Sequence, residues 1–388
     1  MLAAASLSVA VGQLSLGLAL AAFLLVARRD GWRRTGLERP ALALLIWAVA
    51  MVPLALDPGQ ALHNLRRFYL VAAWWVVAAV AVDETVRRRL FVALVAGSVI
   101  AAVWGIVDVI QRYGDLFARR AGHISNPMTT AALLMMGVLV CGAVAITPRV
   151  GRRWRLVAAL AGAVVLLGLL QTMTRSALLG AACGGAVMAL LRWPRRGGVA
   201  AGAVGVVMAL MVAWAGHAPE NNITRRISLA EMSSGRSTTM RVENWRGGLA
   251  IVAARPWTGV GDISLNSVTP RFHPDIQTIY LGHMHSNLVQ FAVIWGVPGF
   301  VLAMTFLVAQ LVILGRRWRR VRALGDRGPP WATAWLIAAI GVWVAFFVAG
   351  LTEWYFGDAE PFLLATAIYG AALGWAPDAD HRAASTSS

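Results

Sequence analysis

Long apolar runs constrain this chain more than any other feature of its sequence. Each run is close to the length, about 20 residues, that a helix needs to cross a bilayer. Hydrophobic residues make up 59% of the 388 residues and charged residues only 14%, against about 25% in typical soluble domains. A soluble fold could not bury so much apolar surface. The sequence therefore predicts an all-α polytopic membrane protein and excludes soluble enzymes, disordered chains and disulfide scaffolds. The eleven predicted spans are 2–26, 40–56, 68–82, 90–110, 128–147, 156–172, 176–191, 198–216, 287–314, 331–352 and 361–375.

The arginines predict how these spans are oriented. All 35 basic residues are arginine, and they occur in short clusters between the apolar runs. The net charge of +17 therefore does not indicate nucleic-acid binding. Connectors that hold 22 arginines alternate strictly with connectors that hold 13. By the positive-inside rule the first set is cytoplasmic, so the N-terminus is expected outside and the C-terminus inside. The expected parts are eight spans in 1–216, a large external loop in 217–286, three spans in 287–375 and a cytoplasmic tail in 376–388.

The external connector 217–286 is the candidate functional region. It contains four of the seven histidines and several aromatic residues among proline and glycine turn signals. Loops of this length are usually functional or disordered, and the aromatic residues argue against disorder. Near-helical spacing predicts an amphipathic helix at the surface of the membrane lipids that ends before Pro256. Its expected apolar face consists of Met240, Trp245, Leu249 and Val252.

Three external arginines are candidates for binding an anion. Most external arginines are expected to pair with acids of the same loop, for which Glu220, Glu231, Glu243, Asp262 and Asp275 are available. Arg175 differs because its connector is too short to leave the interface, and Arg236 and Arg241 open the amphipathic helix. A guanidinium at membrane depth needs an anionic partner. A phosphate or diphosphate fits, because arginine binds it with two parallel hydrogen bonds.

Two histidines lie where the large loop meets the ninth span, in the segment 282–287. Positions two apart on a helix point to different sides, so at most one of His283 and His285 is expected to serve the site. Two such histidines could chelate zinc on a strand, but no HExxH or CxxC motif supports a metal site. The two cysteines, Cys141 and Cys183, lie within apolar runs. The sequence predicts no metal and no cofactor. A histidine beside arginines fits general-base chemistry with a diphosphate leaving group.

The motifs of residues 175–300 resemble those of the O-antigen ligase and O-antigen polymerase superfamily. They are Thr174-Arg175-Ser176-Ala177, Arg241-x-x-x-Trp245, Arg255-Pro256-Trp257-Thr258-Gly259-Val260-Gly261, and His285 followed by Gln290 and Gly296-Val297-Pro298-Gly299. The chain departs from the family in two ways. The asparagine that usually follows the histidine is Ser286 here, with Asn287 one place later, and members commonly have twelve spans. A further helix before the first span would reconcile the two counts.

The resemblance implies an inverting, metal-independent glycosyltransferase of the bacterial inner membrane with its active site facing the periplasm. Its donor would be glycan on undecaprenyl diphosphate. His285 would be the catalytic base, Arg175 and Arg241 would bind the diphosphate, and Arg236 would be a further candidate. Secondary candidates are His283, Trp245 and Asn287.

Four functions remain open from the sequence. The first is a ligase that transfers O-antigen glycan to the core oligosaccharide of lipid A. A polymerase that extends lipid-linked glycan and a protein O-glycosyltransferase would use the same chemistry. A flippase for lipid-linked glycan would need external arginines but not His285, and it should carry polar residues through its spans. The spans here are almost uncharged, with Asp108 as the main exception, which favours an enzyme.

Overall fold

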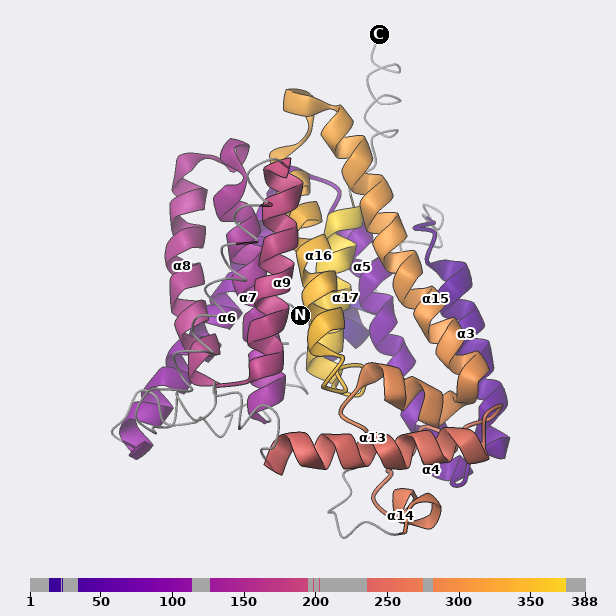
Figure 1. Cartoon of the computed structure of the whole chain (residues 1–388). Helices are drawn as coiled ribbons and strands as arrows, with labels where there is room; N and C mark the ends of the chain where they lie inside the picture. The colour runs from indigo at the N-terminus through magenta and orange to yellow at the C-terminus, as the bar shows by residue number, and fades with distance from the viewer. Residues whose placement is uncertain are drawn as a thin grey trace.

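The computed structural model describes residues 14–21, 23, 34–113, 126–194, 198, 202, 236–274 and 282–374. Within these ranges every regular element is a helix (Figure 1). The predicted span 198–216, apart from positions 198 and 202, and the predicted tail 376–388 lie outside the described residues.

Upright helices form the body of the protein (Figure 1). Six of the described helices, α6 to α9, α15 and α16, are long and apolar enough to cross a membrane, so the prediction of an all-α polytopic membrane protein is confirmed. The count of eleven spans stays a prediction. The upright helices are α3 (Glu38–Met51), α5 (Ala72–Val80), α6 (Glu84–Tyr113), α7 (Pro127–Ile146), α8 (Arg152–Gln171), α9 (Arg175–Arg192), α15 (Asn287–Ala323), α16 (Pro330–Ala349) and α17 (Ala359–Leu373).

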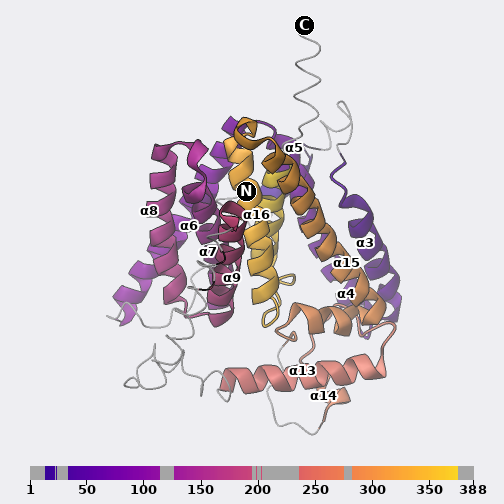
Figure 2. The ribbon, with the colours of Figure 1, turned by 45° about the horizontal axis from the view of Figure 1, so that its top comes forward.

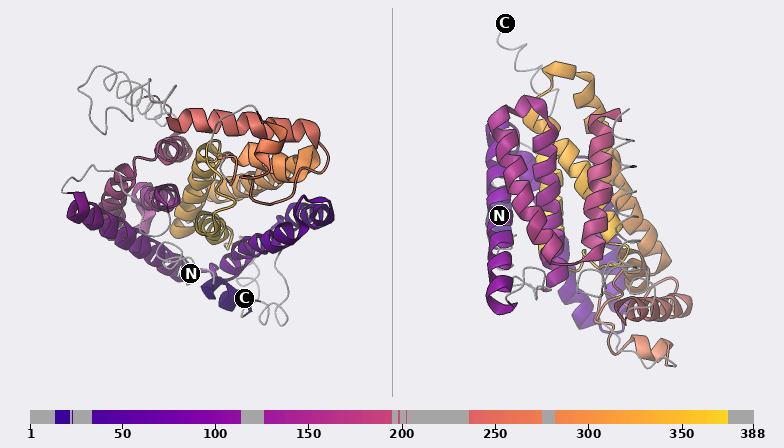
Figure 3. Two further views of the ribbon diagram at one scale, coloured as in Figure 1. Left: turned by 90° about the horizontal axis from the view of Figure 1, so that it is seen from below. Right: turned by 60° about the vertical axis from the view of Figure 1, so that its left-hand side comes forward.

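Helix α16 lies at the centre of this body and packs against α7, α9, α15 and α17. Seen from below, α16 and α17 lie between α6 and α8 on one side and α3 on the other (Figure 3). The contact with α9 is close because it is made by glycines. A Cβ on Gly180 would lie 2.7 Å from the carbonyl oxygen of Ala345, and one on Gly184 2.5 Å from that of Gly341. Small residues allow this close approach where lipid replaces water.

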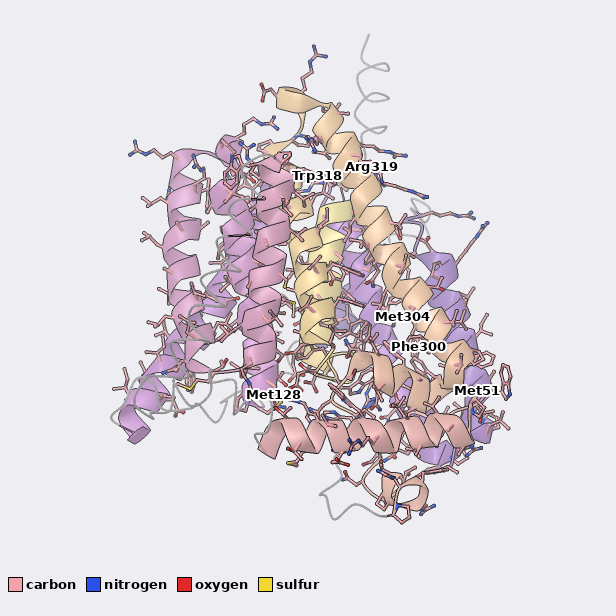
Figure 4. The ribbon with its side chains drawn as sticks, in the orientation of Figure 1. Met51, Met128, Phe300, Met304, Trp318 and Arg319 are labelled. Carbon is pink, nitrogen blue, oxygen red and sulfur yellow. The ribbon has the colours of Figure 1, made fainter. Side chains whose placement is uncertain are left out.

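The connectors divide between two ends of the protein, as their alternation predicted. At one end Arg149 donates to the carbonyl oxygens of Gly325 and Gly328, which joins two of the arginine-rich connectors. We call it the arginine-rich end; Trp318 and Arg319 lie there (Figure 4). At the other end the Thr129 hydroxyl donates to Asp358 over 2.9 Å.

Helix α13 (Arg236–Ala254) lies across this second end, almost perpendicular to the upright helices (Figure 2). We call it the α13 end. The predicted helix and its end before Pro256 are confirmed, and the face of this helix that packs on the protein is a different one from the expected apolar face. The buried stripe is Asn244, Gly247, Gly248 and Ile251, and Leu249 is 62% exposed. The reason is packing: a Cβ on Gly248 would lie 2.8 Å from Met284 and Val289, so glycines rather than large apolar residues face α15.

The connector 57–67, expected as a plain loop, is also helical at the α13 end. Helix α4 (Pro58–Asn64) begins where the Asp57 side chain accepts a hydrogen bond from the Gln60 N–H. The 3-10 helix η2 (Leu65–Val71) follows it. Acidic N-caps of this kind satisfy the unpaired N–H groups of a first turn. The short elements that remain are η1 (Val52–Leu54), η3 (Pro148–Val150), α14 (Thr269–Phe272) and η4 (Gly325–Arg327).

Candidate active site

A buried carboxylate forms the centre of the candidate site at the α13 end. Glu353 lies in the connector between α16 and α17, and its side chain is only 3% exposed. One carboxylate oxygen pairs with Arg241 of α13. The other lies 2.9 Å from Nδ1 of His285, the second residue before α15. Three segments that are distant in the sequence therefore meet in one cluster, joined by an ion pair and a hydrogen bond.

Glu353 determines which nitrogen of His285 can act as a base. An ionised carboxylate can only accept hydrogen bonds, so Nδ1 of His285 carries the proton that Glu353 accepts. The lone pair is then on Nε2, and that nitrogen can take a proton from a substrate. A carboxylate behind a histidine both fixes the ring orientation and stabilises the imidazolium that forms.

The backbone of His285 is held in an unusual conformation. Its φ is +48°, in the left-handed region that bulky residues rarely adopt. The preceding residue is fixed from both sides. The Met284 N–H donates to Oε1 of Gln290 over 2.7 Å, and its carbonyl oxygen accepts from Nε1 of Trp245 over 2.8 Å. A strained backbone persists where its surroundings over-determine it. Trp245 and Gln290 therefore fix the backbone that leads into His285.

Asn287 positions the Glu353 connector against the same segment. Its backbone N–H donates to the carbonyl oxygen of Gly350 over 2.7 Å, and its Oδ1 accepts from the Tyr355 N–H over 3.1 Å. The partners of these two bonds, Gly350 and Tyr355, flank Glu353 in the sequence. Ser286, the departure from the family motif, caps α15 by accepting from the Val289 N–H.

His283 lies beside His285 as a neutral neighbour. The two ring centroids are 4.2 Å apart, and the His285 N–H donates to Nδ1 of His283 over 3.3 Å. Burial, reinforced by the positive charge that His285, Arg67 or Arg241 can carry, lowers the pKa of His283 to about 3. An imidazole that accepts a backbone hydrogen bond and does not become charged is suited to orient its neighbour.

The three predicted arginines differ in what the structure shows of them. Arg241 pairs with Glu353, a partner that the sequence analysis did not name. Arg175 is the first residue of α9 and half-buried, just after the left-handed Met173. The packing of α9 on α16 brings it to the end where the Glu353 connector begins. Arg236 opens α13, and its side chain lies outside the described residues.

The glycine motifs join the large loop to α15. Helix α15 is interrupted at Gly296, whose φ is +67°, just before Pro298. The turn after α13 donates two hydrogen bonds to this part of α15. The Val260 N–H donates to the carbonyl oxygen of Val293 over 2.9 Å, and the Gly261 N–H donates to the carbonyl oxygen of Ile294 over 3.0 Å. A Cβ on Gly259 would lie 2.4 Å from the Val293 oxygen. These motifs therefore hold the turn after α13 against α15.

One cavity adjoins His283, and a second cavity shares part of its wall. A polar cavity of about 290 Å³ is lined by residues that include Gln60, Asn64, Arg67, Asp262, His283 and Asp358. A second cavity, of about 350 Å³, is lined mainly by aliphatic and aromatic side chains of α3, η2, α15 and the Glu353 connector. The two share Arg67, Asp262 and Trp354 as wall residues.

Arg67 and Asp262 form an ion pair with a separation of 3.0 Å at the border between these cavities. Burial raises the pKa of the Asp262 carboxyl, and the positive charge of Arg67 opposes this rise. Asp262 was expected to neutralise an arginine of its own loop, and its partner instead belongs to η2. Glu243, another acid named for this purpose, pairs with Arg246 over 2.8 Å.

No cluster of three or more metal-ligating side chains occurs in the described ranges. The residue that sequence reasoning missed is Glu353. The available signal was its place at the end of a predicted span, in a connector without arginine. An ionisable residue at such a depth is expensive to bury and is by default a functional candidate.

The fold and the cluster define a multi-pass membrane protein with a polar site at one end. Residues 160–304 match the family model described as O-antigen ligase. The match supports membership of the O-antigen ligase and polymerase superfamily and confirms the resemblance seen in the motifs. It includes His285 and the three candidate arginines, but Glu353 lies beyond it. No curated protein matches the chain significantly. The family suggests a membrane glycosyltransferase.

Proposed function

We propose that the protein is an O-antigen ligase, which transfers glycan from undecaprenyl diphosphate to the core oligosaccharide of lipid A. The observation that carries the proposal is the 2.9 Å contact between His285 and the buried Glu353, in a chain whose residues 160–304 match the O-antigen ligase family. With Glu353 accepting from Nδ1, the lone pair of His285 is on Nε2, where a general base needs it.

The reaction is a direct displacement at the anomeric carbon of the donor. A hydroxyl oxygen of the acceptor attacks this carbon while Nε2 of His285 takes the hydroxyl proton. The bond from the anomeric carbon to the diphosphate oxygen breaks, and its electron pair leaves with the diphosphate. One displacement inverts the configuration. The new imidazolium is stabilised by Glu353.

Arg241 and Arg175 bind the diphosphate in this proposal, with Arg236 as a further contributor. The leaving group gains negative charge as the bond breaks, and fixed guanidinium groups stabilise that charge. Arg241 donates to Glu353, which in turn contacts His285, so it can link the leaving group to the base. Guanidinium groups thereby do the work that a metal ion does in other transferases, and transfer should survive excess EDTA.

The α13 end faces the periplasm in this proposal, and the protein lies in the bacterial inner membrane. The support is the arginine bias, which marks the opposite end as cytoplasmic. A reporter that is active only in the periplasm, inserted within 217–286, should therefore be active, and one fused after Ser388 should be inactive. Activity at both points would overturn this orientation.

The lipopolysaccharide of a deletion strain tests the proposed function. A ligase predicts loss of all long-chain glycan from lipid A, with glycan accumulating on the lipid carrier. A single repeat left on lipid A would indicate a polymerase instead, and an unchanged pattern with loss of a glycoprotein would indicate a protein O-glycosyltransferase. Full complementation by His285→Ala would favour the flippase.

A further inference from the structure

The polar cavity has an ordered arrangement of hydrogen-bonding groups. Three side-chain amides around it are each fixed through one of their two polar atoms. Gln60 Oε1 accepts from the Ser264 N–H over 2.6 Å, Asn64 Nδ2 donates to the Asp262 carbonyl over 2.8 Å, and Gln290 Oε1 accepts from the Met284 N–H over 2.7 Å. Their orientations are thereby determined.

The other polar atom of each amide remains for a ligand. Within the part of the chain that the structure describes, Gln60 Nε2, Asn64 Oδ1 and Gln290 Nε2 make no hydrogen bond. All three residues line the cavity. Asp358 adds an acceptor, because only its Oδ2 is used by Thr129. The cavity therefore offers two fixed donors and two fixed acceptors.

We propose that this cavity binds the acceptor sugar whose hydroxyl attacks the donor. The inference rests on the proposed function and specifies one substrate site within it. Donors and acceptors held at fixed positions match a polyhydroxylated ring, whose hydroxyls both donate and accept. The volume of about 290 Å³ is at the lower end for small-molecule sites, which suits a sugar unit and not a lipid.

The order of contacts assigns the cavity to the acceptor and not to the donor. Arg241 contacts Glu353, Glu353 contacts His285, and the His285 ring lies against His283, which lines the cavity. The diphosphate-binding Arg241 is thus on the Glu353 side of the base, and the cavity is on its His283 side. An inverting displacement needs the attacking hydroxyl and the leaving group on opposite sides of the reacting carbon.

Two substitutions can change the cavity without breaking the bonds that shape it. Gln60→Glu keeps the oxygen that Ser264 requires and replaces the free amide donor by an acceptor. Asp358→Asn keeps an oxygen for Thr129 and replaces the free acceptor by a donor. The first adds a negative charge and the second removes one, so a purely electrostatic effect would have opposite signs. His63→Gln is the matched control, since His63 lies on α4, is exposed, and is not part of the cavity lining.

The experiment measures binding of core oligosaccharide, released by mild acid from the lipopolysaccharide of the producing bacterium, to the purified full-length protein. Transfer from the lipid-linked donor is measured in parallel. Both Gln60→Glu and Asp358→Asn should weaken binding by about tenfold, the value of about one good hydrogen bond. Both should raise the KM for the acceptor by a similar factor and leave the KM for the donor unchanged. His63→Gln should match the wild type.

The results separate this inference from the proposed function. Any one of four results would overturn the acceptor site. They are no binding to the wild type, equal binding to all variants, opposite effects of the two substitutions, and a change in the KM for the donor alone. Absence of transfer by the wild type, with oligosaccharide binding that both substitutions weaken, would overturn the ligase and leave the sugar site standing.

Discussion

The two ends of the protein use arginine in different ways. At the arginine-rich end the described guanidinium groups mainly complete the backbone: Arg149 donates to the carbonyl oxygens of Gly325 and Gly328, and Arg192 to that of Ile146 over 3.1 Å. At the α13 end Arg241 and Arg67 pair with the buried carboxylates Glu353 and Asp262. The difference indicates that Arg149 and Arg192 fix connectors at the first end, whereas Arg241 and Arg67 at the second pair with carboxylates buried at the candidate site.

Replacing His285 should cause the largest loss that this comparison predicts. His285→Ala removes the base, which typically contributes a factor of about 10²–10⁴ in rate, so transfer by purified protein should almost disappear at unchanged protein level. His283→Ala, the neighbouring substitution, should cost less than about tenfold because His283 orients the backbone and takes no proton from the substrate. If His283 were the essential residue, the base would have to be reassigned.

Glu353→Gln should have the next largest effect. The amide keeps the shape of the side chain but cannot stabilise an imidazolium, and it can present an N–H to His285. We expect kcat to fall by roughly 10²-fold. The matched control is Glu243→Gln, which breaks only the pair with the exposed Arg246 and should be almost silent. Equal effects of the two substitutions would mean that Glu353 has no special role.

Arg241 and Arg149 compare the two ends directly. Arg241→Ala should raise the KM for the donor by at least about tenfold. Arg241→Lys should recover only part of the lost donor binding, because a point charge cannot replace the planar guanidinium fork. We expect Arg175→Ala to raise the KM for the donor as well, by a smaller factor. Arg149→Ala should leave kinetics unchanged and lower the unfolding temperature by a few degrees, as loss of backbone hydrogen bonds does. A kinetic defect in Arg149→Ala would remove the contrast between the ends.

The smallest predicted effect concerns pH and His283. The pKa of His283 is about 3 in the folded protein and about 6.5 in an unfolded chain. The unfolded chain therefore binds a proton at this position below about pH 6.5 that the folded protein does not bind until about pH 3. Stability from this group is complete above pH 6.5 and is lost as the pH falls toward 3. The unfolding temperature should fall between pH 7 and pH 5, and His283→Gln should reduce that fall.

The sequence predicted much of this arrangement because the signals were local. Apolar length predicted the membrane helices, arginine spacing predicted how the connectors divide between two ends, and Pro256 marked the end of α13. The sequence could not predict Glu353 as the partner of Arg241 and His285, because these contacts join distant residues. Glu353 is 68 positions from His285 and 112 positions from Arg241. The spacing of large apolar residues also could not identify the face of α13 that packs on the protein, because the helix packs through Gly247 and Gly248.

The anomeric configuration of the product tests the central claim most directly. Purified protein is supplied with a lipid-linked donor of known anomeric configuration and with lipid A-core, in excess EDTA, and the new linkage is assigned by NMR. Direct displacement with His285 as the base predicts transfer with complete inversion. Retention of configuration, or transfer only after Mg²⁺ or Mn²⁺ is restored, would contradict it.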